Sequence, residues 1–462
     1  MPKRNVIWIT AIIAAAVVTM WVTRKTPPSA SFFPEDTEDV GEAYRLIRDN
    51  YCLPIESRTL RQGAVEGMVD VLDEFSTYVP PERVAAFEAR MKGIECGVGL
   101  RVAKSGGIVK VLGPIFGGPA YKGNIRSGDR ITSINGQDAA DLSPGQIEQL
   151  LASPAGTQLE LTIVSPDAAR RAVTLTCREF SLQSVQGLYC GQNEQWSCLI
   201  DPSAGIAYLR VTELVNDTGE QFRRMFRQIP AANALVLDLR DNPGGLLPAA
   251  VDLADMFLHG GPIVTVASRG AASKQYEAHA EGTLLDLPVV VLVNASTASA
   301  AEIVAGALLH NDRAVLVGTR TCGKGCIQSM YKLADGLGQI NLTTSQFFFG
   351  ECTPDAGKAD CGTWGVEPHE QVTIPPAQMD VIRRGWIHAQ VPLEAAPDEA
   401  GTLPADKAAD PVAARALHMD PQLARALKLL KEPDQLERIL ARAAQLRAAE
   451  EADSTPEGPA QR

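Results

Sequence analysis

The sequence is organised around one stretch, which reads Asn294-Ala-Ser-Thr-Ala-Ser299-Ala-Ala-Glu302-Ile-Val-Ala-Gly-Ala-Leu-Leu309 and then Gly323-Lys324-Gly325-Cys-Ile-Gln328. A short β-branched run, 289–293, precedes it and predicts a buried strand. Apolar residues then recur with helical spacing from Ile303 to Leu308. The pattern therefore places Ser299 at a strand-to-helix junction, close to the unpaired N–H groups of a helix N-terminus.

A serine hydroxyl becomes a good nucleophile only when a base removes its proton, and a lysine kept neutral by burial is one such base. Lys324 follows Ser299 by 25 residues, between two glycines that allow close backbone approach. Gln328 lies four residues further, on the same face of an emerging strand, where its carbonyl can orient the lysine. We predict Ser299, Lys324 and Gln328 as catalytic residues, although each motif alone is more often a packed helix start or a plain turn.

A second motif, Asp238-Leu-Arg-Asp-Asn-Pro-Gly244-Gly245, lies between a predicted strand at 234–239 and a predicted helix at 247–258. Paired glycines let backbone N–H groups converge on one point, which acyl transfer needs to stabilise a tetrahedral oxyanion. We expect the oxyanion hole to use the N–H of Gly244 or Gly245 together with that of Ala300. A tight strand–helix turn is the structural alternative, and both interpretations can hold together.

These motifs resemble the core of the C-terminal processing (tail-specific) serine proteases, whose common wording is Ser-Ala-Ser-Ala-Ser-Glu-Ile, Gly-Lys-Gly-x-x-Gln and Asp-Leu-Arg-x-Asn-Pro-Gly-Gly. Thr297 and Ala301 replace serines that are frequent in that family, and neither is the nucleophile. The resemblance extends from about Asp39 to Val372. It implies an α/β (α+β) multidomain fold: a crotonase-like spiral α/β protease core, an N-terminal helical segment and an inserted β-rich domain. The chemistry that this resemblance implies requires no metal and no cofactor.

The inserted domain shows short β-like runs interrupted by one helical stretch at 144–152. The segments Gly97-Val98-Gly99-Leu100 and Gly128-Asp-Arg-Ile-Thr-Ser-Ile-Asn-Gly136 resemble a PDZ domain, a module that adds a peptide C-terminus as a strand to a sheet edge. We expect the N–H groups of Gly97, Val98, Gly99 and Leu100 to cradle the terminal carboxylate. Protein or peptide substrates with free C-termini are therefore the expected partners. A plain β-rich insertion without a peptide site is the alternative.

Composition and charge limit the other partners. The chain has 462 residues, 45% of them hydrophobic and 21% charged, with a net charge of −12. This balance, without a basic cluster, argues against nucleic acid. An uncharged run of 19 residues, 5–23, lies between Lys3-Arg4 and Arg24-Lys25. Its helical length of roughly 28 Å is just enough to span a bilayer. We favour an uncleaved membrane anchor over a cleavable signal peptide, and expect an exported protein that faces the bacterial periplasm.

The nine cysteines include couples that flank turn-like segments, Cys190 with Cys198 and Cys352 with Cys361. We predict hairpin disulfides at these two places, with unreactive core thiols as an equally good alternative. No spacing matches a zinc site.

The expected organisation is that of an envelope endopeptidase that captures substrate C-termini and cleaves them by Ser-Lys acyl-enzyme chemistry. Two alternatives remain: a PDZ adaptor on an inactive core, and an acyl-CoA enzyme of the crotonase type. A tail with one or two amphipathic helices at 420–450 could dock on the core or mediate homo-oligomer formation. The expected segments are the anchor or signal sequence at 1–25, a helical part at 31–92, the PDZ domain at 93–180, the protease core at 181–376, and a linker with a helical tail at 377–462.

Overall fold

A computed structural model describes residues 38–166, 169–191, 195–229, 232–284, 286–349, 365–390, 415 and 417–454. The chain divides into two units, residues 1–72 and 73–462. In the first unit, the described part consists of helices α2 (Glu38–Asn50) and α3 (Ser57–Asp70). Both helices leave several apolar side chains exposed, among them Leu46, Ile47 and Met68.

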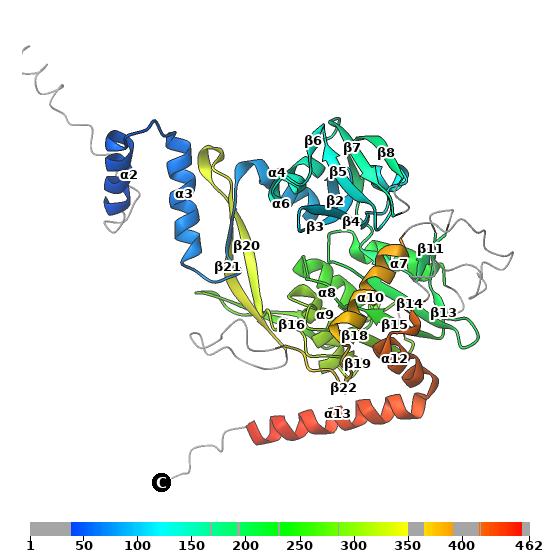
Figure 1. The fold of residues 1–462 in the computed structure, drawn as a ribbon. Coiled ribbons are helices and arrows are strands. Elements are labelled where there is room, and N and C mark those ends of the chain that lie inside the picture. The colour runs from blue at the N-terminus through cyan, green and yellow to red at the C-terminus, as the bar shows by residue number, and fades with distance from the viewer. Residues whose placement is uncertain are drawn as a thin grey trace, which may run out of the picture. The chain divides into compact units, whose positions relative to one another are not determined.

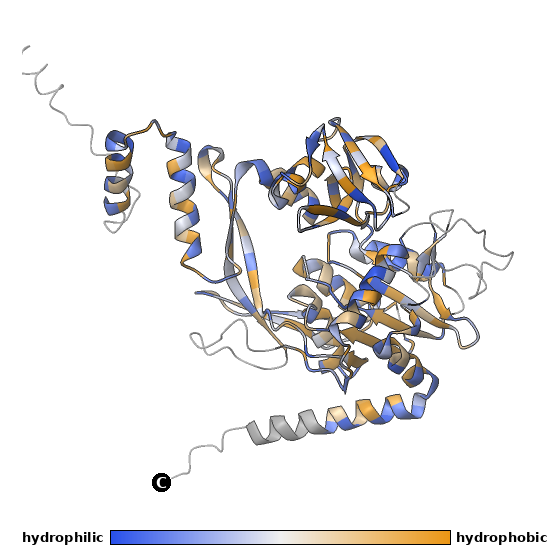
Figure 2. Ribbon diagram, viewed as in Figure 1, coloured by the Kyte–Doolittle hydropathy of each residue, from blue (hydrophilic) through white to orange (hydrophobic). Residues whose placement is uncertain are grey.

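The centre of the second unit is a seven-stranded mixed sheet (Figure 1). Five strands run parallel in the order β14-β15-β18-β19-β22, and β10 and β13 pair antiparallel with β14. Figure 2 shows the middle strands as strongly hydrophobic, as expected for strands covered on both faces. The strands are β10 (Val185–Gln186), β13 (Leu199–Asp201), β14 (Ile206–Val211), β15 (Ala234–Asp238), β18 (Val289–Val293), β19 (Val315–Gly318) and β22 (Glu370–Gln371).

Successive strand residues point to opposite faces of the sheet, so both faces carry apolar side chains that need to be buried. Helices cover both of these faces. Leu235 and Leu237 belong to a core cluster with residues of α7 (Thr218–Arg227), α8 (Leu247–Asp255) and α9 (Ala300–His310). Val236 and Val290 belong to a second cluster with Leu423 of α12 (Pro421–Lys431). The predicted tail therefore docks on the core. Helix α13 (Pro433–Ser454) follows α12, and α10 (Pro376–His388) precedes both.

A second sheet carries the segment that follows Lys324. Its order is β1-β21-β16-β17, with β20 also paired to β21. The long hairpin of β20 and β21 places Gln328 opposite Thr343. The elements are β1 (Thr77–Val79), α4 (Pro81–Met91), β16 (Pro262–Ser268), β17 (Lys274–Glu277), η2 (Ala280–Gly282), β20 (Cys326–Lys332), η3 (Ala334–Gly336) and β21 (Gln339–Phe348).

The β-rich segment folds around its own hydrophobic core, which includes Val98, Val109 and Leu161. Its sheet has the order β3-β4-β5-β7-β8, so β3 is an edge strand. Its elements are β3 (Leu100–Ser105), β4 (Ile108–Pro114), α5 (Pro119–Lys122), β5 (Arg130–Ile134), β6 (Gln137–Asp138), α6 (Pro144–Leu151), β7 (Gln158–Val164) and β8 (Arg170–Thr176). Two small ribbons flank it in sequence: β2 (Ile94–Gly97) with β9 (Arg178–Ser181), and β11 (Tyr189–Cys190) with β12 (Trp196–Ser197).

The disulfide prediction is wrong for the first cysteine couple. Cys198 is a free, buried thiol whose Sγ donates to the carbonyl of Trp196, and burial raises its pKa to about 12. It is thus the unreactive core thiol of the alternative. The second couple, Cys352 and Cys361, lies outside the described residues, as do the predicted anchor at 1–25 and residues 391–414 of the predicted linker and tail. No helix in the described ranges is long and apolar enough to cross a bilayer.

Candidate active site

Ser299 occupies the junction that the sequence predicts. Strand β18 ends at Val293, a turn follows, and α9 begins at Ala300, so Ser299 is the residue that precedes the helix. Its φ is +54° and its ψ −122°, a conformation that few residues other than glycine adopt. Such strain persists only where surrounding contacts hold it, and it recurs at functional sites. One of the contacts that hold this serine comes from a buried carboxylate.

That carboxylate is Glu302, in the first turn of α9 and only 1% exposed. Its Oε2 accepts from the backbone N–H of Ser299 at 2.8 Å and from that of Lys324 at 2.9 Å. Its Oε1 accepts from the N–H of Gly323 at 2.7 Å and from the Thr321 hydroxyl at 2.5 Å. Burial raises its pKa, although these four donors act in the opposite direction. One side chain thus joins the backbones of the serine turn and the lysine loop.

Sequence reasoning assigned no role to Glu302. A glutamate at the third position of a helix, just after a small polar residue, is the pattern by which a side chain reaches back to the preceding N–H. That signal could have identified the bond to Ser299. The bonds to the loop some twenty residues later depend on tertiary structure.

The glycine motif lies directly against the serine turn. Gly244 has a φ of +95°, and a Cβ there would lie 2.7 Å from the Ala298 oxygen, 2.8 Å from the Ala300 nitrogen and 2.9 Å from the Ser299 Cβ. The N–H of Ala298 donates to the carbonyl of Asn242 at 2.9 Å. The residue type is therefore explained by close approach, since only glycine leaves room.

The backbone donors at this place are not equivalent. The N–H of Gly244 donates to Asn242 Oδ1 at 2.8 Å, so it is already engaged. In the described ranges, the N–H groups of Gly245 and Ala300 have no acceptor. Gly245 is held by backbone bonds on both sides, where Leu214 N–H donates to the Gly244 carbonyl and Leu246 N–H donates to the Leu214 carbonyl. Two uncommitted donors therefore flank the serine turn.

The side chain of Lys324 does not meet Ser299 in this structure. Its Nζ lies 4.8 Å from the centroid of the Phe75 ring, a cation–π contact. Among the described residues, Nζ makes no hydrogen bond or ion pair, and none joins it to Ser299 or Gln328. The structure thus brings together the backbones of the predicted pair but not their reacting groups.

Gln328 is oriented by a short chain of hydrogen bonds. Its Nε2 donates to Thr343 Oγ1 at 3.1 Å and to Cys326 Sγ at 3.2 Å, and Thr343 Oγ1 donates to Asp73 Oδ1 at 3.0 Å. Among the described residues, no donor contacts the amide oxygen of Gln328, which leaves that oxygen as an acceptor. Asp73 thus supports Gln328 through Thr343, and Phe75 contacts Lys324.

Part of the predicted carboxylate cradle, residues 97–100, is already engaged in backbone hydrogen bonds. The N–H of Val98 donates to the carbonyl of Leu151 at 2.9 Å, while Gly97 belongs to the β2–β9 ribbon. Gly99, with a φ of +68°, has no acceptor for its N–H in the described ranges, and Leu100 begins the edge strand β3. Any carboxylate cradle here would therefore rely on Gly99 and Leu100 rather than on Val98.

Two histidines lie apart from this chemistry. His310 ends α9, and its ring stacks on Phe349 at 5.2 Å. His369 accepts from the backbone N–H of Leu316 through Nδ1 at 3.0 Å, and burial lowers its pKa. Neither contact involves Ser299.

Comparisons with known proteins identify the family of the chain. Models of the families "Peptidase family S41", "PDZ domain" and "Activating protease CtpB N-terminal domain" match residues 205–372, 111–165 and 15–82. A carboxyl-terminal-processing protease of Synechocystis is 31% identical over 372 residues, covering 75% of this chain and 83% of that protein. A chloroplastic C-terminal processing peptidase of Tetradesmus obliquus is 32% identical and covers 74% of this chain and 75% of that protein.

Among solved structures, a photosystem II D1 C-terminal processing protease is 28% identical, with 78% of this chain and 99% of that chain covered and a TM-score of 0.44. The sequence likenesses carry the assignment because they span most of both chains. The chain is a serine peptidase with an α/β multidomain fold and a PDZ domain, and it belongs to peptidase family S41, among the carboxyl-terminal-processing proteases.

Proposed function

We propose that this peptidase cleaves polypeptides near a free C-terminus, with Ser299 as nucleophile and Lys324 as general base. The observation that carries the proposal is that the N–H groups of Ser299 and Lys324 donate to the same oxygen of Glu302. A buried carboxylate shared in this way keeps the two residues adjacent whatever their side chains do. The remaining step is a rotation of the flexible Lys324 side chain from Phe75 toward the serine.

In the proposed chemistry, Ser299 Oγ attacks the scissile carbonyl while neutral Lys324 takes its proton and then passes it to the leaving amine. The N–H groups of Gly245 and Ala300 stabilise the oxyanion, because they are the donors without acceptors beside the serine turn. Gln328 steadies the lysine through its amide oxygen. Water then hydrolyses the acyl-enzyme, with Lys324 again as base.

The edge position of β3 supports capture of the substrate tail by the PDZ domain. A peptide that adds antiparallel to β3 would bring its carboxylate to the N–H groups of Gly99 and Leu100. Amidation of the peptide C-terminus should therefore weaken binding, whereas a change at its N-terminus should not.

The test compares Ser299→Ala with Ser296→Ala, an exposed serine of the same turn. Ser299→Ala should abolish cleavage of a peptide with an apolar free C-terminus while its binding persists, and Ser296→Ala should cleave at the wild-type rate. Equal turnover by Ser299→Ala would refute the proposal, and a wild-type protein that binds but never cleaves would favour the PDZ adaptor.

We further propose that the protein works in the bacterial cell envelope, anchored by residues 1–25. The uncharged run at 5–23 supports this. Exposed apolar side chains on α2 and α3 support self-association. Membrane fractionation of the full chain and light scattering of the purified protein test these two statements.

A further inference from the structure

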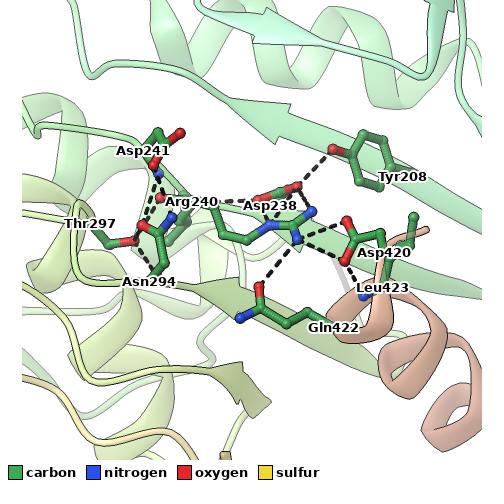
Figure 3. Close-up of polar contacts among 10 residues, drawn as sticks. Tyr208, Asp238, Arg240, Asp241, Asn294, Thr297, Asp420, Gln422 and Leu423 are labelled. Carbon is green, nitrogen blue, oxygen red and sulfur yellow. Dashed lines mark hydrogen bonds and ion pairs between the residues drawn. The ribbon is translucent and has the colours of Figure 1, made fainter. Parts of the chain in front are cut away.

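The guanidinium of Arg240, 0% exposed, is held by two carboxylates from distant parts of the chain. Nε and Nη2 donate to Asp238, at 2.6 Å for the shortest bond. On the opposite side, Nη1 donates to Asp420, with contacts of 2.7 and 3.0 Å, and to Gln422 Oε1 at 3.2 Å. Figure 3 shows the guanidinium between Asp238 and Asp420. Tyr208 completes the cluster by donating to Asp238 at 2.7 Å.

Arg240 lies within the motif 238–245, in the turn that leads to its two glycines, and this turn is hydrogen-bonded to the serine turn. The hydroxyl of Thr297 donates to the Leu239 carbonyl at 2.9 Å, and the N–H of Asp241 donates to Asn294 Oδ1 at 3.1 Å. Displacing Arg240 would therefore shift the backbone that leads to Gly245. Because oxyanion stabilisation depends on donor placement within a fraction of an ångström, such a shift should reduce the rate of chemistry.

Asp420 belongs to the tail of the chain and is 3% exposed. It is the N-cap of α12, where it also accepts from the N–H of Leu423 at 3.0 Å. The peptidase family model matches residues 205–372 and so does not include it. Without this carboxylate, Nη1 of Arg240 would lose its charged partner in a site closed to water and keep only neutral acceptors such as Gln422, which is costly for a buried cation.

We propose that Asp420 is a positioning residue, through which the tail helix α12 holds Arg240 and thereby the turn that carries the oxyanion donor Gly245. The inference rests on the proposed function, since it concerns the rate of the same reaction. It assigns the tail a part in catalysis as well as in covering the sheet.

The main variant is Asp420→Asn. Asparagine is an equally good N-cap, so α12 keeps its cap while the charge opposite Arg240 is lost. The matched control is Lys431→Met, which removes the ion pair of α12 with Asp201, 2.6 Å long and half-exposed, without touching Arg240. Both variants loosen the same helix, but only the first acts on the guanidinium.

We expect kcat of Asp420→Asn to fall about tenfold with KM within twofold, because misplacing an oxyanion donor affects the transition state alone. A peptide aldehyde reports the same interaction: Ser299 Oγ adds to its carbonyl carbon, the hydroxyl proton passes to Lys324, the π bond breaks, and the carbonyl oxygen takes the oxyanion position. Affinity for the aldehyde should fall with kcat, whereas affinity for the matching peptide amide should not. Lys431→Met should match the wild type in kcat, in affinity for the aldehyde and in affinity for the amide.

A folded Asp420→Asn protein with wild-type kcat would overturn the inference, as would an equal loss of affinity for the aldehyde and the amide. In an Arg240→Gln background, Asp420→Asn should add nothing, because Asp420 then has no Arg240 guanidinium to hold; a further tenfold loss would contradict the link. If circular dichroism shows Asp420→Asn unfolded, Gln422→Met decides: a two- to threefold parallel loss of kcat and aldehyde affinity supports the inference, and an unchanged kcat refutes it.

Failure of the proposed function is recognised separately. Full cleavage by Ser299→Ala would refute both the proposed function and the role of Asp420. An inactive Ser299→Ala together with wild-type kcat in Asp420→Asn would refute only the role of Asp420.

Discussion

Replacing Glu302 with glutamine should separate catalysis from stability. Glutamine keeps one acceptor oxygen and presents an NH2 group where the other oxygen stood, so one pair of the four hydrogen bonds is lost. Two bonds to a buried charged group would cost about 3–6 kcal/mol by themselves. The raised pKa of Glu302 shows, however, that burial disfavours its ionised form more than the donors favour it, and glutamine removes that cost as well.

The two effects therefore offset each other in stability but not in catalysis. We expect Glu302→Gln to lose only about 1–2 kcal/mol of unfolding free energy, measured by urea denaturation. Its kcat should fall about 100-fold, because the same oxygen aligns both Ser299 and Lys324 and misalignment is expensive in rate.

The control is Glu220→Gln, also at the third position of a helix, α7, but exposed and paired with Arg223 at 2.9 Å. It should leave kcat unchanged and stability within about 0.5 kcal/mol. The reasoning is refuted if Glu302→Gln keeps kcat within twofold of the wild type, or if its activity falls only in proportion to its folded fraction.

Three further substitutions test neighbouring parts of the account. Gly244→Ala should lower kcat at least 100-fold because its Cβ would meet the serine turn at 2.7–2.9 Å. The control is Gly270→Ala, which is also at positive φ but in open space. In paired kinetic and urea assays, this control should lose stability but keep its kcat. Thr343→Val should lower kcat about three- to tenfold in the same assay, since it removes the acceptor that orients Gln328; an unchanged kcat would dismiss that chain of hydrogen bonds. Burial lowers the pKa of His369 below 6.5, so as the pH falls the unfolded state protonates this histidine before the folded state does. The free energy of unfolding should therefore decline between about pH 7 and 5, by at most about 1.4 kcal/mol per pH unit. Thermal unfolding of His369→Asn should show a shallower decline, and an identical slope would refute the assignment.

The local patterns predicted the local structure well. The β-branched run became β18 with the predicted bounds, and the apolar stripe after Ser299 became α9. The predicted strand at 234–239 likewise became β15, a continuous apolar run, because burial on both faces leaves little choice of residue type. Spacing also predicted that the serine would precede a helix.

The contacts that join these elements were beyond such patterns. Glu302 bonds to a loop near Lys324, Asp73 to a strand some 270 residues away, and Arg240 to Asp420 across 180 residues. A hydrogen bond of this kind depends on which elements the fold places side by side, and periodicity within one segment carries no such information. The same limit explains the cysteines: sequence separation suggested a disulfide, but Cys198 packs as a thiol in the core.

The proximity of Ser299 and Lys324 is the central claim, and acylation tests it most directly. A single turnover of an activated peptide ester, followed by intact-protein mass spectrometry, should show one adduct that maps to Ser299 in the wild type. Lys324→Met should form the adduct at least 100-fold more slowly while binding the peptide normally. Acylation at the wild-type rate without Lys324, or an adduct on any other residue, would contradict the account.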